Sequence, residues 1–145
     1  MTTKLIDTNI LVYANNEDSK FHAVCKSLVE KAVNGRIKTV VSVQNLIELY
    51  AVITDQRRVE HPLSPIKAKQ LIEFYKSSHI RVIVPLAQTV DTITKLIEKH
   101  GPKSQSVFDY LLVATMLDNG VHGIYTANSE HFKHFDSIKV INPIS

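Results

Sequence analysis

The sequence contains one cysteine, no tryptophan and four glycines in 145 residues. A single cysteine excludes an internal disulfide framework and a cysteine-based zinc finger. Cys25 lies in FHAVCKSLVEKA, where apolar residues recur at helical spacing, so we expect a buried apolar side chain and not a nucleophile. This cysteine usage fits a reducing, cytoplasmic setting.

The few glycines also exclude several phosphate-binding classes. Gly35, Gly101, Gly120 and Gly123 are scattered, so neither a dinucleotide-binding loop nor a Walker loop is present. The chain has no G-x-S-x-G nucleophile elbow. Asn9 stands where a haloacid-dehalogenase-like phosphatase would have its second aspartate, and no adjacent acidic pair near the first expected strand indicates a receiver domain.

Long apolar runs are missing as well. No run approaches the length of a membrane span, and Asp7 interrupts the apolar stretch after Lys4, so we expect no signal peptide and no membrane partner. The excess of 17 basic over 14 acidic residues gives a net charge of +3, which is compatible with an anionic partner without requiring one. The length predicts one domain over residues 1–145.

Short β-branched runs alternate with longer helical patterns along the whole chain. Apolar strands of this kind, separated by helices, predict an α/β fold: a three-layer α/β/α sandwich with a mostly parallel sheet of about five strands. Ser19 and Ser64 are the expected N-caps of two helices. The expected strands cover residues 4–7, 38–42, 80–85, 122–127 and 138–143, and the expected helices cover 9–14, 19–35, 43–56, 64–77, 86–101 and 106–120, with a short turn or helix at 129–135.

Three carboxylates follow strands or begin helices. Asp7 closes the first expected strand, Glu48 lies early in the helix after the second, and Asp109 lies in the first turn of the helix over 106–120. Ligands of open parallel sheets bind beyond the carboxyl ends of the strands, where these residues would meet. Each has a structural alternative: Asp7 as a helix cap, Glu48 on a solvent-facing helix surface, and Asp109 in a capping box with Ser106.

Grouped carboxylates indicate a hard divalent cation. Mg²⁺ takes oxygen ligands, usually a few carboxylates with waters and substrate phosphate, and it would relieve the repulsion between the three acids. His131 and His134 are three residues apart and could bind a metal with a further ligand, although histidines at such spacing are more often surface or cap residues.

Four stretches resemble one known family in order along the chain: LIDTNILVY, NLIELYAVI, VFDYLLVATM and IYTANSEHF. The sequence resembles the PIN-domain family, and more narrowly the VapC-like ribonuclease toxins of VapBC toxin–antitoxin pairs. The resemblance implies a PIN-like sandwich and a Mg²⁺- or Mn²⁺-dependent endoribonuclease acting on single-stranded or structured RNA. It also implies an antitoxin partner and a homodimer, for which the apolar-rich segment 70–84 is a candidate contact.

The resemblance assigns roles residue by residue. Asp7, Glu48 and Asp109 match the catalytic, metal-binding acids, and Thr126 matches the threonine that ends the fourth strand. Asn128 stands where the family often has a fourth acid, and His131 where it often has an acid before phenylalanine. Asn9, Thr126, Asn128 and Glu130 are therefore candidate supporting residues.

Candidate RNA contacts are basic or hydroxyl side chains near these acids: Lys103, Ser104, Ser106, Arg57 and Arg58, each of which alone is typical of a solvated surface. Two other functions remain open at this level. One is a PIN-like module that binds RNA or protein without cutting, and the other is an RNA-processing nuclease outside any toxin–antitoxin system.

Overall fold

The computed structural model describes residues 2–145 and contains one five-stranded sheet. Every pairing in it is parallel, and the strand order is β3-β2-β1-β4-β5. The prediction of a mostly parallel sheet of about five strands is confirmed. The strands are β1 (Lys4–Ile6), β2 (Thr39–Ser42), β3 (Arg81–Ile83), β4 (Gly123–Tyr125) and β5 (Lys139–Ile141).

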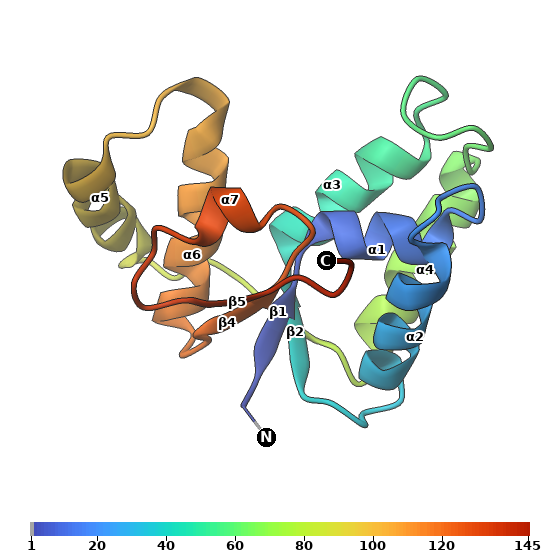
Figure 1. Cartoon of the computed structure of the whole chain (residues 1–145), viewed down its shortest axis with the longest axis horizontal. Coiled ribbons are helices and arrows are strands. Elements are labelled where there is room, and N and C mark those ends of the chain that lie inside the picture. The colour runs from blue at the N-terminus through green and yellow to red at the C-terminus, as the bar shows by residue number, and fades with distance from the viewer. Residues whose placement is uncertain (1) are drawn as a thin grey trace.

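Helices cover both faces of the sheet, as Figure 1 shows. One group consists of α1 (Thr8–Asn15), α2 (His22–Val33), α3 (Val43–Ile53) and α4 (Pro65–Ser77), and the other of α5 (Thr89–His100), α6 (Val107–Asp118) and the short α7 (Ser129–Phe132). A single 3-10 turn, η1 (Ser104–Ser106), leads into α6. Within residues 2–145, no helix has both the length and the apolar character needed to cross a bilayer.

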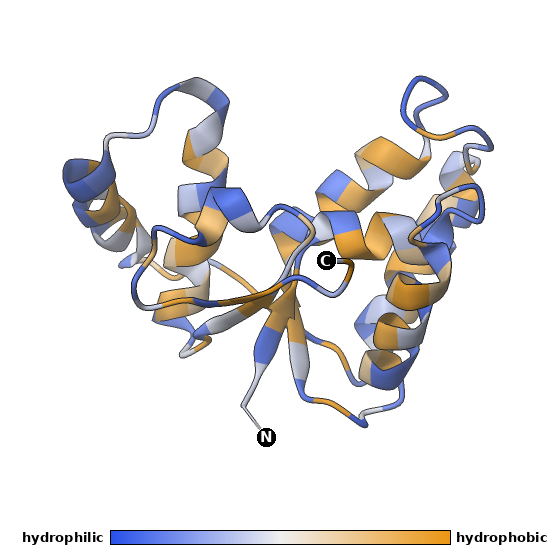
Figure 2. Cartoon of the chain, viewed as in Figure 1, coloured by the Kyte–Doolittle hydropathy of each residue, from blue (hydrophilic) through white to orange (hydrophobic). Residues whose placement is uncertain are grey.

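The alternation of side chains along the strands builds a separate core on each face. In β1, Ile6 packs with the α1–α4 group, and Leu5 packs on the opposite face with α6 and the residues around α7. Both are fully buried, and burial of a side chain of this size contributes about 1.5–3 kcal/mol. Cys25 is also fully buried, as expected. Figure 2 shows hydrophobic residues where strands meet helices and hydrophilic residues on the outer loops.

Helix starts follow local capping chemistry more closely than apolar spacing. Ser64 caps α4 as predicted, since its hydroxyl accepts from the Lys67 amide. Ser19 does not cap α2, which begins only at His22; its hydroxyl accepts from the Phe21 amide and shapes the preceding turn. The sequence interpretation of Ser19 was therefore wrong, because a hydroxyl two residues before a free amide forms a turn as readily as a cap.

The topology places the candidate acids at one edge. Asp7 directly follows β1, and Thr126 directly follows β4, the neighbouring strand. Strands β2 and β3 lie on one side of β1, and β4 and β5 lie on its other side. The order in which strands are added therefore reverses between β1 and β4, and open α/β sheets bind ligands at such a reversal. Helix α6 precedes β4, so its first turn, with Asp109, begins above this same edge.

Two glycines with positive φ provide a test of backbone strain. Gly35 has φ of +74°, and an added Cβ would lie 2.8 Å from His79 Cδ2; Gly101 has φ of +59° with open space around it. We expect Gly101→Ala to lower the free energy of unfolding by about 1 kcal/mol, from the left-handed conformation alone. Gly35→Ala should lower it by about 2 kcal/mol or more, since the ring must also shift. Urea denaturation measures both, and equal losses would show that the contact with His79 is unimportant.

Candidate active site

A cleft of about 1320 Å³ lies above the carboxyl edge of β1 and β4. Its walls come from α1 and α3 on one side and from η1, α6 and the residues around α7 on the other. The lining contains all three predicted acids, Asp7, Glu48 and Asp109, together with apolar side chains such as Ile47 and Phe108. Three segments that are distant in sequence therefore contribute carboxylates to one space.

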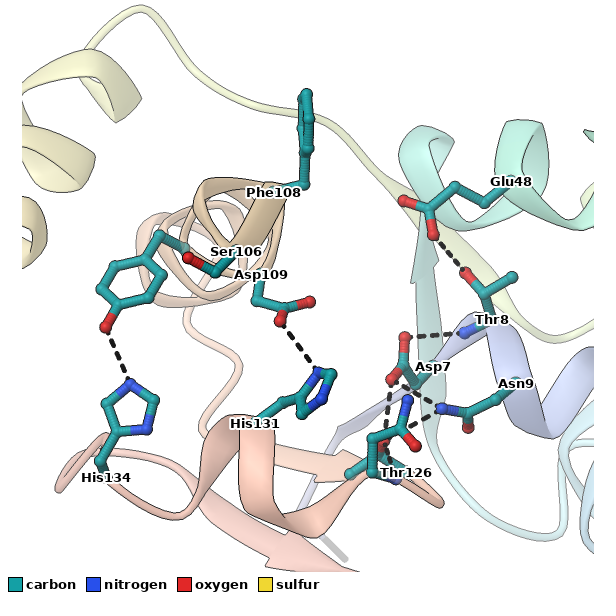
Figure 3. A network of polar contacts seen from close by, with 12 residues as sticks. Asp7, Thr8, Asn9, Glu48, Ser106, Phe108, Asp109, Thr126, His131 and His134 are labelled. Atoms are coloured by element: carbon teal, nitrogen blue, oxygen red, sulfur yellow. Dashed lines mark hydrogen bonds and ion pairs between the residues drawn. The ribbon is translucent and has the colours of Figure 1, made fainter. Parts of the chain in front are cut away.

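Asp7 is held at the base of the cleft by three donors (Figure 3). Its Oδ1 accepts from the Thr8 amide at 2.8 Å, and its Oδ2 accepts from Thr126 Oγ1 at 2.8 Å and from Asn9 Nδ2 at 3.3 Å. The side chain is the N-cap of α1, so the capping interpretation is correct as far as it goes. A cap alone would not need the additional donors from Thr126 and Asn9.

The electrostatic environment of Asp7 disfavours a negative charge. The pKa of Asp7 is raised from the ordinary value of 3.8 to about 6, mainly by burial and to a smaller extent by the charges of Asp109 and Glu48. Hydrogen bonds from Thr126 and Thr8 oppose this rise. No basic side chain of residues 2–145 forms an ion pair with Asp7. A buried carboxylate without a counter-ion is the kind of group that a cation stabilises.

The hydrogen bond from Thr126 gives a further prediction. Thr126→Val should raise the pKa of Asp7 above 6, because the donor that favours the ionised form is lost. It should also lower the free energy of unfolding by about 1–2 kcal/mol at pH 8. A ¹³C NMR titration of the carboxyl group and urea denaturation measure the two effects.

Thr39→Val is the matched control, because the Thr39 hydroxyl is buried and has no hydrogen-bond partner. We expect it to leave the pKa of Asp7 unchanged and the fold at least as stable. An Asp7 pKa that does not move in Thr126→Val would contradict the role given to this hydroxyl.

Glu48 is exposed to the cleft and oriented from both sides. Gln44 Nε2 donates to its Oε1 at 2.9 Å, and Thr8 Oγ1 donates to its Oε2 at 3.4 Å. Gln44 Nε2 also donates to the Phe108 carbonyl at 3.1 Å, which links α3 to α6. Glu48 is therefore exposed, as the structural alternative predicted, but its side chain faces the solvent inside the cleft.

A buried amide supports this arrangement from below. Asn45 forms a reciprocal capping box with Ser42 at the start of α3, and its Nδ2 donates to Thr8 Oγ1 at 3.1 Å. The Thr8 hydroxyl is thereby oriented to donate toward Glu48. Sequence reasoning did not identify Gln44, Asn45 or Thr8, although the pattern Ser-x-x-Asn resembles a capping box and could have indicated Asn45.

Asp109 lies in the first turn of α6 but does not cap it. Ser106 has helical backbone angles and no capping bond, and its hydroxyl donates to the Lys103 carbonyl at 2.7 Å. The capping-box alternative for Ser106 and Asp109 is therefore wrong, because η1 continues directly into α6 and leaves no extended cap residue. The Asp109 side chain is free to face the cleft.

One oxygen of Asp109 is paired with a histidine. Asp109 Oδ2 lies 3.2 Å from His131 Nδ1, as Figure 3 shows. Burial raises the pKa of Asp109, whereas His131 and His134 oppose the rise. His134 is engaged elsewhere, since its Nε2 lies 2.9 Å from the Tyr110 hydroxyl. The two histidines at i and i+3 therefore have different partners and do not form one site.

The predicted supporting residues separate into two groups. Asn9 and Asn128 line the cleft; Asn9 Oδ1 accepts from the Ala127 amide, and the Asn128 amide donates to Thr126 Oγ1. Together they fix the loop after β4 against Asp7. Glu130 instead pairs with Lys133 and does not line the cleft.

The predicted RNA contacts also fall into two groups, those that line the cleft and those that lie outside it. Arg58 and Ser106 line the cleft, whereas Lys103 and Ser104 lie just outside it. Arg57 pairs with Asp55 at 3.1 Å on the surface and lies outside the cleft lining. Adjacent arginines thus face different surroundings, which their order in sequence does not reveal.

The three acids of the cleft form a donor set of the kind that holds a cation. Asp7, Glu48 and Asp109 supply only oxygen atoms, which suits hard cations. Within residues 2–145, the one group of three whose ligand atoms all lie within 4.8 Å of one another is Asp18, Glu60 and His61, on an exposed surface outside the cleft. The three cleft acids are spaced more widely, so a cation there would be held together with water or substrate oxygens.

This fold and cleft define a class of protein. The PIN domain family matches residues 4–138, and the chain belongs to that family. It is similar to Ribonuclease VapC24 of Mycobacterium tuberculosis, with 30% identity over 141 residues, covering 97% of this chain and 96% of the relative. Ribonuclease VapC48 of the same organism is 26% identical over 144 residues, which cover 99% of this chain and 99% of the relative.

Solved structures share the fold at lower identity. VapC20 of Mycobacterium tuberculosis, a sarcin–ricin loop cleaving toxin, has a TM-score of 0.66 and 17% identity, with 92% of this chain and 95% of that chain covered. The VapBC2 complex of Rickettsia felis, bound to promoter DNA, has a TM-score of 0.68 and 18% identity, with 97% and 98% covered. The predicted PIN-like fold and family resemblance are confirmed.

Proposed function

We propose that this chain is a divalent-metal-dependent endoribonuclease and the toxin of a toxin–antitoxin pair. The observation that carries the proposal is the convergence of Asp7, Glu48 and Asp109, from three separate elements, on one cleft of a PIN domain. The VapC relatives are named ribonucleases. A binding module without activity would gain nothing from acids that repel phosphate, and the buried charge of Asp7 would only destabilise it.

The proposed roles follow from the contacts. Asp7 and Asp109 would hold Mg²⁺ or Mn²⁺, with Glu48 bound directly or through water. When bound, such a cation lowers the pKa of water and offsets charge that develops on the phosphate. Thr126 fixes the direction of Asp7, and Gln44 that of Glu48. No protein nucleophile is required in this scheme.

The cleft walls suit a nucleic-acid strand better than a small substrate. Phe108 is 50% exposed at the rim and offers a ring for base stacking. Arg58 lines the opposite part of the cleft and would contact the phosphate backbone. The net charge of +3 agrees with an RNA substrate. An RNA substrate in turn implies a cytoplasmic location.

The test is cleavage of single-stranded and structured RNA by the purified chain with Mn²⁺, with Mg²⁺ and with excess chelator. We expect cleavage that chelator abolishes and products that carry 5′-phosphate and 3′-hydroxyl ends. Single-stranded DNA of the same sequence serves as the substrate control. RNA binding without cleavage at millimolar cation would instead support the alternative of a binding module.

The partners are part of the same proposal. The solved structures of this fold include a toxin–antitoxin complex from Klebsiella pneumoniae and VapBC2 of Rickettsia felis, so we propose an antitoxin encoded beside this chain; its absence would favour an RNA-processing nuclease. We also propose a homodimer. The segment 70–84 is less available for it than expected, because Tyr75, Ile80 and Ile83 are buried in the cores, and of its large apolar side chains only Phe74 and Val84 are about half-exposed. Light scattering at micromolar concentration tests the dimer.

A further inference from the structure

The contact between Asp109 and His131 has no role in the scheme above. His131 lies in α7, lines the cleft and keeps 56% of its side chain exposed. Its Nδ1 faces Asp109 Oδ2 at 3.2 Å, and Figure 3 shows the imidazole between Asp109 and the Asp7 cluster. Apart from His131, no basic side chain of residues 2–145 pairs with Asp109.

We propose that His131 Nδ1 is itself a ligand of the cation, next to Asp109 Oδ2, and that this nitrogen makes the site favour Mn²⁺ over Mg²⁺. The inference rests on the proposed function, because it concerns the cation of that cleft. It assigns to His131 a direct bond to the metal, whereas a purely structural histidine would only orient Asp109.

The spacing of the two atoms suits this role. Neighbouring ligands of an octahedral ion with bonds of about 2.1 Å lie about 3 Å apart, and the observed separation is 3.2 Å. Both side chains can therefore turn toward a common ion without a change of backbone. Coordination through Nδ1 requires the tautomer that carries its proton on Nε2, which the exposed side of the ring allows.

Ligand chemistry then determines the choice of metal. Mg²⁺ strongly prefers oxygen ligands and parts reluctantly with its water. Imidazole suits transition metals, and their affinities exceed that of Mg²⁺ at nitrogen-containing sites. Asp7 and Asp109 alone would accept either ion. The addition of one nitrogen donor therefore shifts the preference toward Mn²⁺.

Electron spin-echo modulation of bound Mn²⁺ tests the bond directly, because it detects a coordinated imidazole nitrogen. We expect the ¹⁴N signal in the wild type and its loss in His131→Gln. His134→Gln is the matched control, since His134 lines the same cleft but contacts Tyr110. His61→Gln removes the one other metal-binding geometry found in residues 2–145. The signal should persist in both controls.

Calorimetric titration supplies a second measurement. In His131→Gln the affinity for Mn²⁺ should fall by about tenfold or more, with little change for Mg²⁺. In His131→Asp the ratio of Mn²⁺ to Mg²⁺ affinity should fall because Mg²⁺ binds more tightly to the added oxygen.

Three results would overturn the inference: no ¹⁴N signal in the wild type, a signal that survives in His131→Gln, or one that disappears in His61→Gln. None of them touches the proposed function, which depends on cleavage and its loss with chelator. Conversely, a nitrogen-ligated ion in a chain that never cleaves RNA would leave the ligand assignment intact and refute the nuclease.

Discussion

Asp7→Asn is expected to abolish RNA cleavage and to stabilise the fold at neutral pH. Cleavage should fall by at least about 100-fold, because loss of a cation ligand removes several kcal/mol of transition-state stabilisation. Stability should move in the other direction. The folded pKa of about 6 exceeds the ordinary 3.8, so an ionised Asp7 costs the folded state about 3 kcal/mol at pH 8.

The sign of this effect reverses with pH. Between about pH 4 and pH 6 the folded protein binds a proton at Asp7 that the unfolded chain releases, so wild-type stability falls as pH rises. Asparagine has no such dependence, but its NH2 group must face one of the donors that the carboxyl oxygens of Asp7 accept from, which costs about 1–2 kcal/mol. The variant should therefore be more stable than the wild type at pH 8 by about 1–2 kcal/mol and less stable at pH 4.

Urea denaturation at several pH values, without added metal, measures this crossing. Asp136→Asn is the control with the same loss of charge, because Asp136 is an exposed acid paired only with Lys99. It should leave both cleavage and the pH dependence unchanged. A variant of Asp7 that still cleaves RNA, or that is less stable than the wild type at every pH, would contradict the account of this residue.

Asp109→Asn is expected to abolish cleavage without a large loss of stability. Since Asp109 does not cap α6, removal of its charge takes away only the partly exposed pair with His131. Pairs of this kind contribute about 1 kcal/mol or less. Cleavage should fall by at least about 100-fold, as for Asp7.

Ser106→Ala is the control that separates the loss of a catalytic acid at Asp109 from a structural effect in the same segment. The Ser106 hydroxyl contacts Lys103 and supports η1, so its loss should lower stability modestly and reduce cleavage far less than the loss of Asp109 does, even though Ser106 lines the cleft. If Asp109→Asn instead loses several kcal/mol of stability while it retains cleavage, the residue is structural and the cleft has only two functional acids.

The fold could be predicted from the sequence because its signals are periodic and local. Strands β1 and β2 are short apolar runs buried on both faces, and Ser64 with Pro65 marks the start of α4 without ambiguity. Ser19 was misassigned as a cap because its hydroxyl accepts from the Phe21 amide in the turn before α2. Helix boundaries depend on which amide a side chain reaches, and apolar spacing carries no information on that choice.

The three acids could be predicted as well, since each lies next to a strand end or helix start. Their partners could not. The contacts of Gln44 with Phe108 and of Asp109 with His131 join residues that are far apart in sequence. The first depends on how far α3 and α6 stand from each other across the sheet, and the second on where α7 lies beside α6. Both placements result from packing of both cores and have no local pattern.

The pairing of β1 with β4 has a consequence for the timing of synthesis. Asp7 meets Thr126 across 119 residues of sequence, and β1 occupies the centre of the sheet between β2 and β4. A nascent chain therefore carries Asp7 early, but Asp7 gains the hydrogen bond from Thr126 only after β4 leaves the ribosome and docks. The cleft is thus assembled late in synthesis, so the messenger RNA being translated meets a working nuclease only after most of the chain has been made.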